Sequence, residues 1–410
     1  MYTINTTMSL FSGREKRVRY GVLIEIGSGS VLLSIIKSDA TKINPEVIWS
    51  QREFASLKSK QTSNQDDKAI MSSLLNVILQ INNNGYKALR SYSSTAQIKY
   101  VQVSVTAPWS FTISKTIDYT KETEFVVSQE LIDSLISVAK KKMTEIMLEK
   151  ELTNKYDFSL LTEVITDFRL NDYQTNQPLK QKVKSLSLTQ IVALASTFIT
   201  ETVIDLQQKV LPRAEIVQYS FMMIFYSFIK NFYSRLSCYC LIDITYEATE
   251  IVIVRNSAFQ TTNHTTIGIN TIARNIANAL NIPHEEAISF LREPYHSTAL
   301  KALPKNKLEL LQKVFVNYQT ELRELFTENN ANFSIPRDIF FHCSMADNAF
   351  LLELISEVAK TVTNLSHQVT EISEAIITKY YSPTEKKKLT ENNIDTGVLL
   401  EAQFFHQHES

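Results

Sequence analysis

The residues best suited to chemistry are two acids, Glu25 and Asp243, each at the end of a short apolar run and each followed by a tight turn. A second apolar run follows both turns, so we expect two β-hairpins. Backbone N–H groups in such turns can hold phosphate oxygens, and the carboxylates can hold a hydrated Mg²⁺. If the two turns face each other, the sequence predicts a nucleotide clamp with both acids as metal ligands and Asp243 as the catalytic residue.

The first turn carries two of the seven glycines of the chain. Glycine suits a phosphate-binding turn because a Cβ hinders positive φ values and close backbone approach. The residues of this turn expected to bind phosphate are Gly27, Ser28 and Gly29. In the second turn, Thr245 and Thr249 are the matching candidates.

These motifs resemble those of the actin-like ATPases, and within them those of the FtsA and PilM branch. The first motif of that branch reads acid-x-Gly-Ser/Thr, as Glu25 to Ser28 do, and the second reads Asp-x-Gly-x-x-x-Thr. Asp243 and Thr249 match the second motif, and Thr245 stands at its glycine position. The resemblance implies an α/β, actin-like fold, which is a duplicated ribonuclease H-like architecture of two lobes, with ATP and Mg²⁺ as cofactors.

Two further elements of that family contribute glycines to the nucleoside side of the site. Gly268 stands alone where the family tends to have a pair, and the strand-turn-helix at 339–347 has no glycine. The resemblance places His342 and Ser344 of this segment beside the base or ribose. With so few glycines we predict that ATP·Mg²⁺ is bound weakly and hydrolysed slowly or not at all, as in a degenerate ATPase.

Hydrophobic periodicity predicts the elements that position these residues. Strands are expected in the hairpins at 20–36 and 240–255, and at 98–105, 110–117, 159–170, 183–188 and 339–341. Helices are expected at about 68–82, from 128, and at 196–210, 219–232, 270–280, 308–325, 345–360 and 395–405.

The segment 108–184 reads as strand, helix, strand, strand. This order is similar to that of the SHS2 module that FtsA inserts into its first lobe, and so are the Ser-Gln-Glu-Leu-Ile helix start at 128–132 and the Asn-Asp-Tyr-Gln turn at 171–174. The expected domains are a lead-in at 1–19, a first lobe at 20–107 and 185–236, an SHS2-like insert at 108–184, a second lobe at 237–375, and a return to the first lobe with the tail at 376–410.

Composition restricts the classes of partner and compartment. The 410 residues carry a net charge of −1, whereas a nucleic-acid binder usually shows a strongly basic face, so no nucleic acid is expected. An odd number of cysteines, three, suits a reducing cytoplasm. The most apolar stretch, at 219–229, is shorter than a membrane span, and the start of the chain lacks a signal-peptide pattern.

The resemblance implies a cytoplasmic assembly or scaffold protein of the FtsA type, in cell division, which docks protein partners or self-assembles through the insert. FtsA carries a membrane helix after the fold, and the sequence ends at Ser410 soon after the closing helix, which favours the alternative of a PilM-like adaptor for pilus assembly. An active kinase of the same superfamily is the alternative from another class.

A weak membrane contact is expected at the start of the chain. Leu10 and Phe11 precede a basic cluster of Arg14, Lys16, Arg17 and Arg19, which would bind reversibly to the inner face of the cell membrane.

Overall fold

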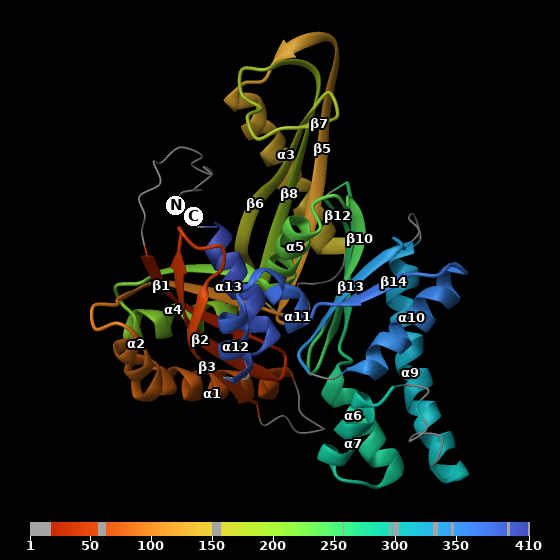
Figure 1. The fold of residues 1–410 in the computed structure, drawn as a ribbon. Coiled ribbons are helices and arrows are strands. Elements are labelled where there is room, and N and C mark those ends of the chain that lie inside the picture. Colours follow the sequence, from red (N-terminus) through yellow and green to blue (C-terminus); the bar gives the residue numbers. More distant parts are fainter. Residues whose placement is uncertain are drawn as a thin grey trace.

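The computed structural model describes residues 18–55, 63–149, 157–256, 258–294, 297, 303–330, 335–345, 348–391 and 394–408. These residues form two lobes, each built on a β-sheet, and an insert with its own sheet that projects away from both (Figure 1). Of the basic cluster expected to touch membranes, only Arg19 lies within the described residues.

The sheet of lobe I has the strand order β3-β2-β1-β4-β9. Its first three strands are antiparallel, and β4 and β9 run parallel to β1. Its strands are β1 (Val18–Ile26), β2 (Ser30–Asp39), β3 (Glu46–Phe54), β4 (Ile98–Val105) and β9 (Glu215–Ser220). Since β1 and β2 are nearly continuous apolar runs, both faces of the sheet need cover.

Helices supply that cover. On one face, α1 (Ser63–Gln80) and α4 (Thr197–Val210) pack against Val22 and Ile24, and on the other α13 (Thr396–His408) packs against Leu23. A short π-helix, η1 (Ile81–Gly85), leads from α1 into α2 (Tyr86–Tyr92).

Lobe II repeats this plan with the order β12-β11-β10-β13-β14 and the same strand directions. The strands are β10 (Cys238–Ile244), β11 (Thr249–Arg255), β12 (Ala258–Thr265), β13 (Asp338–Cys343) and β14 (Gln368–Glu371). One face is covered by α6 (Ile269–Leu280), α7 (His284–Arg292), α9 (Lys305–Asn330) and α10 (Ala349–Thr363). The predicted duplicated, two-lobed α/β fold is therefore confirmed.

A third core lies between the two sheets. It is formed mainly by α5 (Phe221–Phe232), α13 and the segment before α13, packed on the inner faces of β10, β11 and β13. That segment contains α11 (Glu374–Ile377), η2 (Thr378–Tyr380) and α12 (Pro383–Glu391). The lobes therefore share one apolar layer behind the cleft where the two hairpin turns meet.

The insert follows the expected order of strand, helix, strand, strand, with the additional two-residue strand β7 before the last strand, in a sheet ordered β5-β8-β6-β7 with α3 (Gln129–Glu149) packed on it. Its strands are β5 (Ser110–Val126), β6 (Phe158–Leu170), β7 (Tyr173–Gln174) and β8 (Lys182–Ser196). β8 pairs with β5 as far as Ala195, beyond the expected boundary at Lys184. At the base of β5, the indole Nε1 of Trp109 donates a hydrogen bond to the carbonyl of Gly27 at 3.2 Å.

Two of the expected boundaries that differ from the structure have a physical explanation. β5 continues to Val126, whereas the prediction stopped at Ile117, because the outer half of the strand is largely polar and exposed and shows no clear alternation of apolar and polar residues. Residues 219–220 end strand β9 and do not start the helix, because the side chain of Ser220 caps α5 by accepting from the N–H of Met223.

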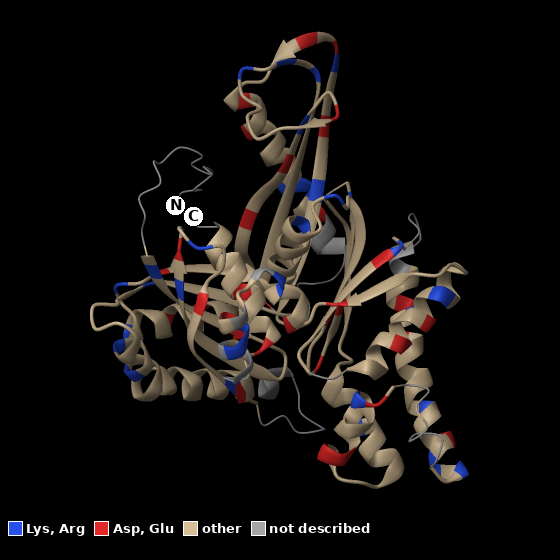
Figure 2. Ribbon diagram, in the orientation of Figure 1, with Lys and Arg blue, Asp and Glu red and all other residues tan. Residues whose placement is uncertain are grey.

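Charged residues of both signs lie on the surface helices, and the helices that the structure describes are not strongly apolar over long stretches. Lys and Arg alternate with Asp and Glu over the helices of lobe II (Figure 2). Within the described residues, no helix combines the length and hydropathy that a bilayer crossing requires.

Candidate functional site

The two predicted turns do face each other across the cleft. Each is closed by a backbone hydrogen bond, from the N–H of Gly27 to the carbonyl of Ser30 and from the N–H of Thr245 to the carbonyl of Ala248, both at 2.9 Å. They connect β1 to β2 and β10 to β11, so the repeated topology brings them together. The structure thus unites the two halves of the site that the sequence predicted.

One side chain fills the space between the turns. The hydroxyl of Ser28 lies 2.7 Å from the Thr245 hydroxyl, and it accepts a hydrogen bond from the backbone N–H of Glu247 at 2.7 Å. That N–H is the kind of donor that a phosphate oxygen would use. A Cβ on Gly29 would lie 2.5 Å from the Cβ of Tyr246, so the backbones also approach closely.

The start of helix α6 is closed in the same way. The N–H groups of Ile269 and Asn270 donate to the carbonyls of Thr245 and Tyr246 at 3.1 and 2.8 Å. A Cβ on Gly268 would lie 2.4 Å from the Thr245 carbonyl oxygen, so this position needs glycine to pack the helix start on the turn. These helix N–H groups therefore bind protein carbonyls, where a helix start could otherwise bind an anion.

Glu25 is buried beside an arginine that sequence reasoning missed. Arg52, on β3, contacts Glu25 Oε1 through Nη1 at 3.1 Å and Asp395 Oδ2 through Nη2 at 2.9 Å. Its Nη1 also donates to the Ser30 hydroxyl at 2.7 Å. Burial raises the pKa of Glu25, and the positive charge of Arg52 opposes that rise.

Besides Glu25 and Asp395, a third acid, Glu401, interacts with Glu25. Glu401, on α13, is buried and accepts a hydrogen bond from the hydroxyl of Ser104. Burial, and then the charge of Glu25, raise the pKa of Glu401 well above its usual range. Gly397, the second residue of α13, also belongs to this region, because a Cβ there would lie 2.4 Å from Glu25 Oε2.

Asp243 is paired with His342. Their Oδ1 and Nδ1 atoms lie 2.8 Å apart, and both side chains are buried. Burial works against protonation of His342, but the hydrogen bond and charge of Asp243 outweigh it and raise the pKa of the imidazole. The ring packs against Phe221, with centroids 4.9 Å apart, and its buried Nε2 has no hydrogen-bond partner among the described residues.

The remaining predicted residues have structural partners. Thr249 donates to the carbonyl of Ile267 at 2.8 Å and lies 3.0 Å from the Tyr318 hydroxyl. The carbonyl of Ser344 accepts a hydrogen bond from the Tyr246 hydroxyl at 3.1 Å. Tyr246 thus ties the second turn to the third predicted element of the site.

In this arrangement the residues do not fit ATP·Mg²⁺. Ser28 fills the predicted phosphate position, and Glu25 and Asp243 are engaged by Arg52 and His342. In the part of the chain that the structure describes, no three His, Cys, Asp or Glu side chains form a metal-ligand set. The catalytic and metal-binding roles given to these two acids stay predictions that require the cleft to rearrange.

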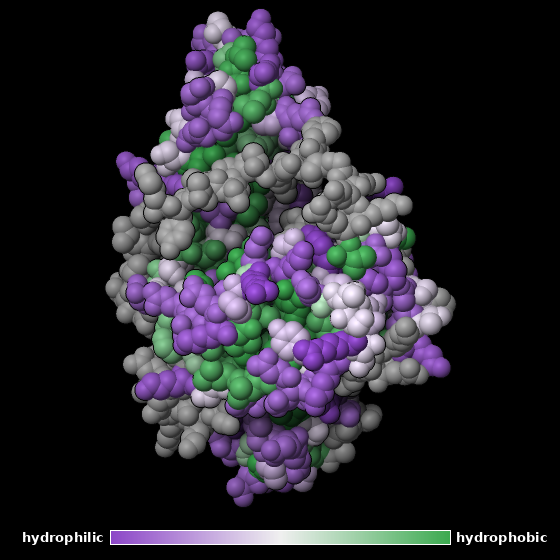
Figure 3. All heavy atoms as spheres, turned by 90° about the vertical axis from the view of Figure 1, so that its left-hand side faces the viewer, coloured by the Kyte–Doolittle hydropathy of each residue, from purple (hydrophilic) through white to green (hydrophobic). Residues whose placement is uncertain are grey.

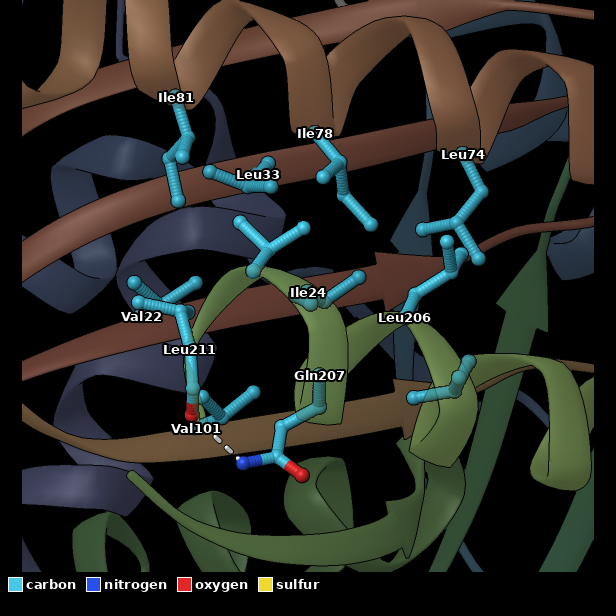
Figure 4. A pocket seen from close by; sticks show the side chains of 12 residues that line it. Val22, Ile24, Leu33, Leu74, Ile78, Ile81, Val101, Leu206, Gln207 and Leu211 are labelled. Atoms are coloured by element: carbon cyan, nitrogen blue, oxygen red, sulfur yellow. Dashed lines mark hydrogen bonds between the residues drawn. The ribbon is translucent and has the colours of Figure 1, made fainter. Parts of the chain in front are cut away.

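A small cavity lies elsewhere, inside lobe I between α1, α4 and the sheet (Figure 4). Its volume of about 20 Å³ has room for roughly one water molecule. The lining is apolar except for Gln207, whose amide donates to the carbonyl of Leu211 at 2.7 Å. This cavity is a packing defect of the core and not a substrate site.

The duplicated sheets, the facing turns and the C-terminal return to lobe I define the actin-like ATPase fold. A PilM-PilN type IV pilus biogenesis complex is similar at 13% identity, with 95% of this chain and 99% of that chain covered and a TM-score of 0.54. Two further solved structures are the ethanolamine utilization protein EutJ from Carboxydothermus hydrogenoformans (11% identity, 85% and 84% covered, TM-score 0.41) and MreB5 of Spiroplasma citri bound to ADP (10%, 91% and 98%, 0.41).

Comparison of the sequence with known families and proteins does not assign the chain to a family. No protein-family model and no curated protein matches the chain. At these identities the structural likeness establishes the fold alone.

Proposed function

We propose that this protein is an actin-fold assembly adaptor that binds other proteins and turns over ATP slowly or not at all. The observation that carries the proposal is the contact of Ser28 with Thr245 and with the N–H of Glu247, which occupies the space where phosphates would bind. The same contact weighs against the alternative of an active kinase, because a kinase must admit ATP to this cleft.

The insert is the proposed protein-binding region. At its outer end it exposes Val126, Tyr173 and Leu179, at 57%, 80% and 44% of their full accessible surface. The end of β5 and the start of β8 meet there, since the N–H of Val127 donates to the carbonyl of Gln181 at 2.9 Å. Apolar residues lie beside hydrophilic ones on the insert, the upper part of the view in Figure 3. Exposed aromatic and aliphatic side chains are typical anchors of protein interfaces.

Two biological roles fit this proposal. A PilM-like adaptor would bind the cytoplasmic tail of a membrane partner at the inner face of the cell membrane, and the likeness to the PilM-PilN complex over nearly the whole of both chains supports it. An FtsA-type division scaffold, with the insert as an SHS2-like module, would instead self-assemble. We favour the PilM-like role because of the likeness to the PilM-PilN complex.

Nucleotide binding is tested by thermal unfolding with Mg·ATP and Mg·ADP, together with a phosphate-release assay. A nucleotide at about ten times its Kd would stabilise the fold by about 1.4 kcal/mol, which is readily detected. We expect no saturable rise in Tm. A saturable rise, with turnover that Asp243→Ala abolishes, would contradict the proposal.

The two roles are separated by binding and by assembly. Fluorescence anisotropy with peptides from the cytoplasmic tails of the host's single-span membrane proteins should find a specific ligand for a PilM-like adaptor. Sedimentation velocity should show monomers or small oligomers with or without nucleotide. Concentration-dependent polymers without any peptide ligand would favour the FtsA-type role.

A further inference from the structure

Arg52 is unusual because it is a long basic side chain directed into the part of the cleft where this fold would hold a metal. Its side chain is only 11% exposed. Its Nε and Nη2 both contact Asp395 Oδ2, at 3.0 and 2.9 Å, and its Nη1 contacts Glu25 Oε1 at 3.1 Å. One guanidinium therefore bridges two carboxylates, a geometry that suits its planar fork of donors.

These carboxylates come from distant parts of the chain. Glu25 is the last but one residue of β1, and Asp395 directly precedes α13, where its Oδ1 accepts from the N–H of Gly397 at 2.7 Å. Gly397 has no side chain, which leaves room for the Glu25 carboxylate above the helix start. The bridge therefore fixes the first turn of α13 to the strand that leads into the first cleft turn.

An acid cluster of this kind needs a counter-charge. Glu25 is 2% exposed, so water screens the charge of its carboxylate poorly. A divalent cation bound to Glu25 would supply that charge in a nucleotide-loaded cleft. Here the guanidinium supplies it from within the chain.

We propose that Arg52 takes the place of a divalent cation as the counter-ion of Glu25 and Asp395, and so keeps the start of α13 attached to β1 in the absence of metal and nucleotide. The inference does not depend on which protein the insert binds. Because Arg52 supplies this counter-charge, the contact between α13 and β1 requires no bound metal.

The test uses the full chain, freed of metal with a chelator, and three variants. The wild-type Tm should not change with millimolar Mg²⁺, Ca²⁺ or Mn²⁺. Arg52→Gln should lower the Tm by on the order of 5–10 °C, because it leaves the buried carboxylate of Glu25 without its counter-charge. Millimolar Mn²⁺ should restore most of that loss saturably, and electron paramagnetic resonance should show Mn²⁺ bound to this variant but not to wild type.

The other two variants keep the test decisive if Arg52→Gln does not fold. Arg52→Lys retains the charge and should fold with a Tm that is insensitive to metal. The double variant Arg52→Gln/Glu25→Gln removes the positive charge and the buried negative charge that it pairs with, and should recover much of the lost stability without metal.

Arg274→Gln is the matched control, since Arg274 pairs with Glu247 at 2.6 Å outside this cluster. It should show no response to Mn²⁺. The inference is overturned if wild type or Arg52→Lys gains stability saturably with metal, or if folded Arg52→Gln is unaffected by all three cations. It is also overturned if the double variant is no more stable than Arg52→Gln.

Discussion

The hydroxyls of Ser28 and Thr245 lie 2.7 Å apart although 217 positions separate them in the chain. Each belongs to a turn that, in this fold, would face the phosphates of a nucleotide. Direct contact between the turns means that lobe I and lobe II meet without a ligand between them.

Replacing Ser28 with Ala should destabilise the protein by about 1–3 kcal/mol, because it leaves the N–H of Glu247 and the Thr245 hydroxyl without this partner in a buried site. Urea unfolding followed by circular dichroism measures the change. Ser72→Ala, on the exposed face of α1, is the control and should stay within about 0.5 kcal/mol of wild type. Equal effects of the two substitutions would show that the turns do not depend on Ser28.

Asp243 and His342 should behave as one coupled pair. Asp243→Asn should destabilise the fold by about 1–3 kcal/mol, because it removes the charge that favours the protonated imidazole. Combined with His342→Phe, which keeps the ring packing on Phe221, its effect should be smaller by about 0.5–3 kcal/mol than in the wild-type background. Additive effects in this double-mutant cycle would contradict the coupling.

Stability should depend on pH through Glu250. Burial, and then the charge of Asp243, raise the pKa of Glu250 well above its usual range. The folded state therefore holds this proton more tightly than the unfolded state, so the contribution of Glu250 is present at low pH and is lost as pH rises through its folded pKa. Relative to wild type, Glu250→Gln should raise the Tm at about pH 8 and change it little near pH 5.

Differential scanning fluorimetry across this range measures that effect. Glu324→Gln, at an exposed position on α9, is the control and should shift the Tm by the same small amount at every pH. A Glu250→Gln variant whose Tm follows the wild-type pH curve would show that Glu250 does not titrate in this range.

The outer end of the insert should matter for binding and not for folding. Replacing Val126, Tyr173 and Leu179 together with Ser should leave the Tm within about 2 °C of wild type, because the three side chains are already exposed. The same variant should lose binding to the peptide ligand or, for an FtsA-type protein, self-assembly. Ile43→Ser, at a position that is 77% exposed in lobe I, should retain both. Unchanged binding by the triple variant would place the interface elsewhere.

Local pattern was sufficient to predict the two hairpins and the order of the insert. Glu25 and Asp243 stood at strand ends next to turns, and a turn is determined by residues close in sequence. Their actual partners could not be found in this way. Arg52 belongs to β3, and Asp395 lies far along the chain. Their meeting depends on strand register and on the return of α13 to lobe I.

The edges of elements escaped prediction for a related reason. β9 lies at the sheet edge and is only partly buried, so Glu215 to Ser220 show no strong alternation. The absence of glycine at position 245 did indicate a changed site. It did not indicate that the Ser28 side chain would fill the space between the turns.

The long strand β5 has a mechanical consequence. Its 17 residues span roughly 55 Å, from Val126 at the outer end of the insert to Ser110 beside Trp109. Trp109 holds the carbonyl of Gly27, and the insert is braced on lobe II where Arg169 donates to the carbonyl of Asn256 at 2.8 Å. The insert thus contacts the turn of Ser28 through Trp109 and lobe II through Arg169 of β6. A protein that pulls on the tip loads the joint between the lobes directly.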